Sequence, residues 1–130
     1  MLHPDQFSVN EAWIAFRLND APIRTERDGS FHCIALMDAA SCFILATEFV
    51  AASAEDASPL EVRRLLKKGR SHRNQLPKTL LLAREHAGTT IEREASRQKI
   101  EVVRVPEREL QVFIGEARDR FRERFGASTQ

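Results

Sequence analysis

The order of the apolar segments is the feature that most constrains how this chain can fold. Three strand-like runs come first: AWIAFRL at 12–18, FHCIALMD at 31–38 and CFILATEFVA at 42–51. Only the small residues 39–41 separate the second run from the third, which predicts a hairpin. A polar connection at 21–30, with the turn signal Asp28-Gly29, joins the first run to the second. We therefore expect three consecutive antiparallel strands.

After residue 57 the pattern changes to helices that alternate with single strands. Ser58, Pro59 and Glu61 combine an N-cap, a first-turn proline and a capping box, which predicts the start of a helix. Gly69 is expected to end this helix in a left-handed conformation. The expected apolar stripe consists of Leu60, Val62, Leu65 and Leu66.

Two more strands flank a second helix. KTLLLA at 78–83 predicts a strand buried on both faces, and IEVVRV at 100–105 predicts another. Between them, Thr89 and Glu92 predict a second capping box, which opens a helix that continues to Lys99.

The last segment, 107–125, predicts a long amphipathic helix that ends at Gly126. Its expected apolar face consists of Leu110, Phe113, Ile114, Ala117, Phe121 and Phe125. The expected order of elements along the chain is βββαβαβα. Strands that are joined through a helix run parallel to each other, whereas the two strands of a hairpin run antiparallel. The sequence thus predicts a single α/β domain over 1–130, with its core at 11–126. It would contain a mixed five-stranded sheet with flanking helices, the order of the ribonuclease-H-like fold.

Composition and charge exclude several classes of protein. The net charge is only +1, so no global field draws the chain to nucleic acid or membrane, and any basic surface must be local. No apolar run approaches the roughly 20 residues that span a bilayer, and the N-terminus does not resemble a signal peptide. We expect a cytoplasmic protein without membrane contact. Cys33 and Cys42 are expected to be buried, reduced thiols, and the four histidines have no metal-site spacing.

Several short motifs, in this order, resemble the catalytic core of retroviral-type integrases and bacterial transposases. Trp13 opens the first strand, and LMDAAS at 36–41 places an Asp at a hairpin tip. PKTLLLA at 77–83 leads into a short buried strand, and VVRVP at 102–106 ends the next one. Glu116 precedes a basic and aromatic tail. The resemblance covers about 11–126 and implies a ribonuclease-H-like fold.

The resemblance also implies three carboxylates that hold two divalent metal ions for phosphodiester chemistry. The first position, three residues after the tryptophan, is Phe16 in this chain, and the second is Ala83. Only the third position, Glu116, keeps a carboxylate, and this residue can instead pair with Arg120 one helical turn later. Hydrocarbon side chains cannot coordinate magnesium or manganese, so we expect no metal cofactor and no catalysis. The alternative is a divergent nuclease with Mg²⁺ or Mn²⁺ at a rearranged site of Asp38, Glu85 and Glu116.

A run of cations is the strongest local charge feature. It lies at 63–78 and consists of Arg63, Arg64, Lys67, Lys68, Arg70, Arg73 and Lys78, with no acid among them. The run could track nucleic-acid phosphates weakly, or form an ordinary solvated helix face, which is the interpretation we favour. No aromatic residue for base stacking occurs between Phe49 and Phe113.

These observations predict a non-catalytic binding or interaction protein. Phe121 and Phe125 either pack into the core, which we favour, or protrude beyond the sheet toward a partner helix or toward a second copy of the chain in a homodimer. The protein partner itself cannot be inferred from the sequence.

Overall fold

The sheet is built around its central strand, β1 (Ala12–Arg17). On one side β1 pairs antiparallel with β3 (Gly29–Asp38), and on the other it pairs parallel with β5 (Thr79–Ala83). β4 (Ile44–Ala51) continues the sheet beyond β3, and β6 (Glu101–Val105) continues it beyond β5. The order β4-β3-β1-β5-β6 is the predicted mixed sheet. The computed structural model describes residues 2–27 and 29–126, without the side chains of residues 125 and 126.

The connection at 21–30 differs from the prediction, because it contains a sixth, short strand. This strand, β2 (Ile23–Thr25), pairs antiparallel with the first residues of β3. β3 starts at Gly29 and extends well beyond the residues that pair with β1, so its edge there is open for another strand. The long β3, rather than any pattern within 21–30, therefore determines that β2 forms.

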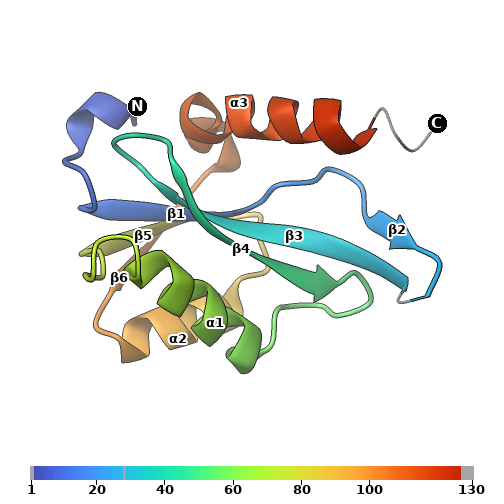
Figure 1. The fold of residues 1–130 in the computed structure, drawn as a ribbon. Coiled ribbons are helices and arrows are strands. Elements are labelled where there is room, and N and C mark those ends of the chain that lie inside the picture. The colour runs from blue at the N-terminus through green and yellow to red at the C-terminus, as the bar shows by residue number, and fades with distance from the viewer. Residues whose placement is uncertain (1, 28, 127–130) are drawn as a thin grey trace.

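Helices cover both faces of the sheet (Figure 1). α1 (Pro59–Arg70) and α2 (Thr89–Arg97) lie on one face, and α3 (Gln111–Phe121) lies on the other. Short turns complete the chain: η1 (Pro4–Gln6) near the N-terminus, η2 (Glu107–Leu110) before α3, and η3 (Arg122–Gly126) after it. The predicted single helix over 107–125 is thus a 3₁₀ turn, an α-helix and a π-helical turn. Within the described residues, no helix is long and apolar enough to cross a bilayer.

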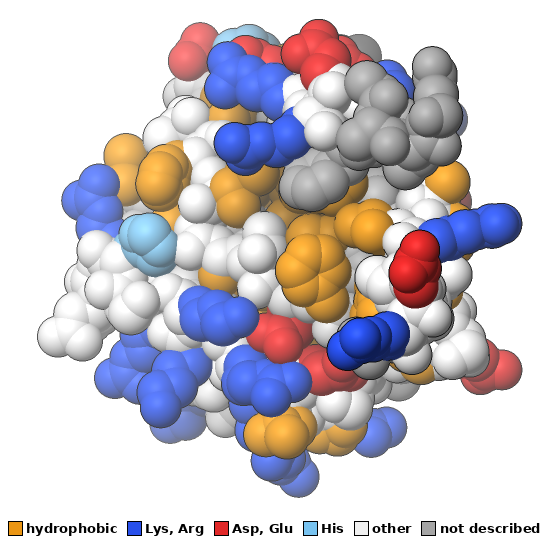
Figure 2. All heavy atoms as spheres, turned by 45° about the vertical axis from the view of Figure 1, so that its right-hand side comes forward, with side chains coloured by type: hydrophobic (Ala, Val, Ile, Leu, Met, Phe, Trp, Pro, Cys, Tyr) orange, Lys and Arg blue, Asp and Glu red, His pale blue; other side chains and the backbone are white. Residues whose placement is uncertain are grey.

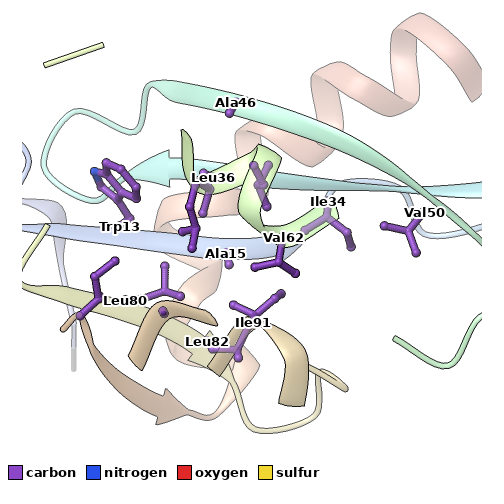
Figure 3. Close-up of a cluster of buried hydrophobic side chains, with 14 residues drawn as sticks. Trp13, Ala15, Ile34, Leu36, Ala46, Val50, Val62, Leu80, Leu82 and Ile91 are labelled. Atoms are coloured by element: carbon purple, nitrogen blue, oxygen red, sulfur yellow. The ribbon is translucent and has the colours of Figure 1, made fainter. Parts of the chain in front are cut away.

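Alternating residues of β1 divide the core into two clusters. Trp13 and Ala15 pack with α1 and α2, as Figure 3 shows for this cluster, whereas Ile14 and Phe16 pack on the α3 side. The second cluster also contains Leu110, Phe113 and Ile114, with Ala117 and Phe121 partly buried against it. Phe121 therefore packs on the core as we favoured, and the side chain of Phe125 lies outside the described residues. Self-association through this end of α3 stays a prediction.

The start of α1 is confirmed, but its predicted end and one member of its stripe are wrong. The Ser58 hydroxyl accepts a hydrogen bond from the Glu61 amide, and the Glu61 carboxylate accepts one from the Ser58 amide. Leu60 is 59% exposed, because the buried face repeats from Val62 at helical steps and Leu60 lies roughly 160° around the helix from Val62.

Gly69 is buried inside α1 and does not cap it. The helix continues to Arg70 and is followed by Ser71 in a right-handed conformation. A Cβ atom at Gly69 would stand 3.1 Å from both the Trp13 ring and the Leu36 side chain. This glycine is therefore needed for close packing of α1 on the sheet.

The predicted capping box of α2 is also wrong. The N-cap is Gly88, which offers no side chain, and the Thr90 amide donates instead to the Asp56 carboxylate at 2.9 Å. Glu92 forms an ion pair with Arg104. A carboxylate distant in sequence thus accepts the hydrogen bond of a free amide in the first turn of α2. The helix ends at Arg97, two residues before the predicted end at Lys99.

The two cysteines are both free thiols, and they differ in burial. Cys33 is buried, and burial raises its pKa to about 11. Cys42 is only half-buried, contrary to expectation, because it occupies the tight turn of the β3–β4 hairpin with a φ of 59°. Burial, with the nearby Asp38 and Glu116 carboxylates, raises its pKa as well. Both thiols are therefore protonated at neutral pH.

Candidate functional site

The positions where the resemblance implies metal ligands carry hydrocarbon inside the core. Phe16 is 2% exposed and Ala83 is 5% exposed, and they lie near the carboxyl ends of the paired parallel strands β1 and β5. Both belong to the α3-side cluster with Leu110 and Ile114. The guanidinium carbon of Arg118 lies 5.9 Å from the centroid of the Phe16 ring. The side chain next to this position at the surface is therefore a cation over an aromatic ring.

Glu116, the third position, lies at the surface of α3. Its side chain is 76% exposed and forms an ion pair with Arg120 at 2.5 Å, one turn further along the helix. This is the i, i+4 pair that the sequence predicts, and such exposed pairs contribute only about 0.3–0.5 kcal/mol.

The three carboxylates of the alternative nuclease site do not meet. Asp38 lies opposite Trp13, at the start of β1, whereas Glu85 follows the far end of β5. The Asp38 carboxylate accepts hydrogen bonds from the Asn10 amide (2.7 Å) and from both the amide and the hydroxyl of Ser41 (3.0 and 2.7 Å). Asp38 therefore stabilises the hairpin turn. No three His, Cys, Asp or Glu side chains within 2–27 and 29–126 are grouped so that they could hold a metal ion.

A cavity of about 440 Å³ opens beside Phe16 and Ala83, at the carboxyl ends of β1 and β5. Arg118 donates to the Glu107 carboxylate at 2.8 Å and to the Arg17 carbonyl at 3.0 Å, and the Glu85 carboxylate accepts from the Glu107 amide at 3.0 Å. Burial is the main reason why the pKa values of His32 and His86 are lowered, so both imidazoles are neutral near pH 7. The cavity thus has walls of mixed polarity, and among the described residues its acidic and histidine side chains do not group into a metal site.

Three cations of the basic run are used to hold the fold together. Arg63 donates to the Glu94 carboxylate of α2 at 2.8 Å, and this hydrogen bond lowers the pKa of Glu94. Arg64 and Lys68 both pair with Glu48 of β4, at 3.2 and 2.8 Å. Figure 2 shows basic side chains gathered in the lower left of one face of the molecule, with acidic side chains beside them toward the lower centre. These three residues are therefore structural.

The other four cations of the run are exposed and have no ion-pair partner among the described residues. They are Lys67 and Arg70 in the last turns of α1, Arg73 in the loop that follows, and Lys78 before β5. The carbonyl end of α1 favours cations here, which explains why they are tolerated together. The basic run thus separates into three cations that form ion pairs and four exposed cations that form none with the described residues.

A surface groove of about 350 Å³ lies beside the second group. It is lined by Val9, Asn10, Asp38, Ser41, Phe43, Leu45, His72 and Arg73. Phe43 is 53% exposed, and the centroid of its ring lies 5.6 Å from that of His72, with the two ring planes at 72°. The sequence shows no aromatic residue within or just after the basic run. The β3–β4 hairpin supplies one, and no local signal predicts this contact.

Comparison with solved structures decides the fold. A chain of the simian T-cell lymphotropic virus intasome, in a complex with the PP2A regulatory subunit B56 gamma, matches with a TM-score of 0.55 and 8% sequence identity. The match covers 88% of this chain and 37% of that chain. This protein has the ribonuclease-H-like fold. The prediction from the motifs is therefore confirmed at the level of the fold.

The HTLV-2 integrase catalytic core domain, solved with magnesium in a dimeric form, also matches the ribonuclease-H-like domain. The TM-score is 0.48 and the identity is 12%, over 84% of this chain and 82% of that one. No protein family model matches the sequence, and no curated protein sequence matches it either.

Proposed function

We propose that this protein is a non-catalytic binding domain that contacts nucleic-acid phosphates weakly, through Lys67, Arg70, Arg73 and Lys78. The proposal rests on one observation, the contrast between the buried core near Phe16 and the exposed surface after α1. Hydrocarbon is buried where the resemblance implies metal ligands, while four exposed cations with no ion-pair partner among the described residues follow one another from the last turns of α1 to the start of β5.

The buried Phe16 and Ala83 support the loss of catalysis. A two-metal site needs several oxygen ligands around each ion, and one exposed glutamate in an ion pair would hold magnesium or manganese only weakly. Burying the Phe16 ring contributes about 1.5–3 kcal/mol to folding instead.

The four free cations support a phosphate-binding role of modest strength. Binding to a phosphate backbone gains free energy from released counterions, so its salt dependence reports the number of contacts. With at most four contacts, the binding constant for a single strand should fall with salt with a logarithmic slope no steeper than about 3.

A salt titration with two charge-matched variants tests this function. Lys67→Glu with Arg70→Glu should weaken binding of a fluorescent oligonucleotide and reduce the salt slope, because two phosphate contacts become repulsive. Arg24→Glu with Arg108→Glu changes the net charge equally at exposed sites elsewhere and should leave binding nearly unchanged. Equal losses in both double variants would mean that only net charge matters, and binding that is insensitive to salt would rule out the phosphate contacts.

A further inference from the structure

We propose that the groove at the β3–β4 hairpin stacks a base of single-stranded nucleic acid on the Phe43 ring, beside the phosphate-binding cations. This inference rests on the proposed function and adds the class of ligand. Phosphate contacts alone do not distinguish a single strand from a duplex, whereas an exposed aromatic ring selects unpaired bases.

The Phe43 ring is available for stacking. It is 53% exposed although it precedes β4 directly, and it lies edge-on to the His72 ring instead of being covered by it. Val9, itself 50% exposed, and the half-buried Leu45 add apolar wall to the same groove. The groove thus offers one aromatic platform with apolar sides, which suits a flat base better than a double helix.

Two hydrogen bonds hold the backbone of Phe43 in place, and further bonds hold the hairpin that carries it. The Phe43 amide donates to the Ser41 hydroxyl at 3.2 Å, and its carbonyl accepts from the Asp38 amide at 2.9 Å. Asn10 joins this hairpin to the loop after α1, because its amide donates to Asp38 and its side-chain amide donates to the Gln75 carbonyl at 3.2 Å. The platform is therefore pre-organised, which reduces the entropy lost on binding.

The charge of the groove also fits a nucleotide. Arg73 lines it and has no ion-pair partner in the described part of the chain, and Arg70 lies one turn earlier at the end of α1. Asp38 is the one acid in the lining, but it is 3% exposed and accepts three hydrogen bonds, so its charge is largely offset. A phosphate held by Arg73 would place the attached base within reach of the groove.

Fluorescence anisotropy with Phe43→Ala tests the proposal. The probes are labelled single strands of about 12 nucleotides, oligo-dT and oligo-U, with a DNA duplex of the same length. Base stacking on one aromatic ring contributes about 1–3 kcal/mol, so Phe43→Ala should raise the Kd for both single strands by about 5- to 150-fold. The salt slope should stay unchanged, because no phosphate contact is lost, and Phe43→Trp should retain binding.

Phe49 offers a matched control. It is 55% exposed on the neighbouring β4 strand but does not line the groove, so Phe49→Ala should leave the Kd unchanged. A tryptophan at position 43 adds a second readout, since its fluorescence should be quenched by a stacked base. Circular dichroism and a thermal melt verify that each variant is folded.

Three results would overturn the inference. If Phe43→Ala binds within twofold of the unaltered protein while Lys67→Glu with Arg70→Glu does not, the stacking site is wrong and the phosphate-binding function stands. If the duplex binds as tightly as the single strands, the ligand class is wrong. If the unaltered protein binds no oligonucleotide at low salt, both the function and the inference fail.

Discussion

Two residues, Asn10 and Gly69, allow the large ring of Trp13 to be buried. The Trp13 ring is fully buried against α1, and its indole N–H donates to the Asn10 side-chain carbonyl at 2.8 Å. Asn10 adopts a φ of 66°, a left-handed conformation that asparagine tolerates better than most residues. On the other side, the absence of a side chain at Gly69 lets α1 approach the ring. The tryptophan that opens the first strand thus has a packing role that depends on distant segments.

Two glycine substitutions test this packing at the residue scale. Alanine is favoured over glycine within a helix by about 1 kcal/mol, so Gly115→Ala in α3, whose nearest neighbour would be 3.8 Å away, should stabilise the protein. Gly69→Ala should instead lower the free energy of unfolding by about 1–3 kcal/mol, because the new methyl group would meet Trp13 and Leu36 at 3.1 Å. Urea denaturation measures both. A stabilised Gly69→Ala variant would show that α1 can shift to make room.

At the scale of elements, the two helices on one face start by different means. α1 carries its own capping box, so its start is local, whereas the start of α2 depends on Asp56, far away in sequence. α1 also contacts the edge strand β4, because Lys68 donates to the Thr47 carbonyl at 3.0 Å and pairs with Glu48 of the same strand. Charged side chains on an edge strand discourage pairing with other chains.

Alanine at the two candidate caps tests this difference. Ser58→Ala should lower the free energy of unfolding by about 1 kcal/mol, because the Glu61 amide loses its acceptor. Thr89→Ala should change it by less than about 0.5 kcal/mol, because Thr89 is exposed and makes no capping bond. Thermal or urea unfolding compares the two variants directly, and equal losses would mean that α2 does have a local cap.

At the scale of the whole molecule, the α3 side of the sheet is a continuous apolar layer. Phe16 and Ala83 extend it through Leu110, Phe113 and Ile114, and Phe7 reaches it from the N-terminal segment, its ring centroid 6.1 Å from that of Phe113. A layer of this kind binds α3 to the sheet and places hydrocarbon at the two positions, Phe16 and Ala83, where the resemblance implies carboxylates.

A metal titration tests this property of the molecule. Millimolar Mn²⁺ or Mg²⁺ should leave the Tm unchanged, because a ligand raises stability only if the native state binds it. The same preparation should not cleave labelled single-stranded or double-stranded DNA or RNA. A rise in Tm with metal concentration that disappears in Glu85→Gln or Glu116→Gln would contradict the proposal and support the rearranged nuclease site.

The sequence by itself determined the order of strands and helices, the mixed sheet and the start of α1. These features follow from apolar periodicity and from contacts between residues only a few positions apart. It also placed Phe16 and Ala83 correctly in buried strands. The strand β2, the cap of α2 and the role of Gly69 escaped prediction, since each depends on a segment that is distant in sequence.

The residues of the candidate site could be identified only from the tertiary structure. The sequence contains the seven cations of the basic run, but only packing decides that Glu94 and Glu48 engage three of them, while the other four form no ion pair with the described residues. In the same way, only folding brings Phe43 of the hairpin beside His72. Periodicity reports which face of an element is buried, whereas ion pairs and ring contacts depend on which elements become neighbours, and that is determined by the complete core.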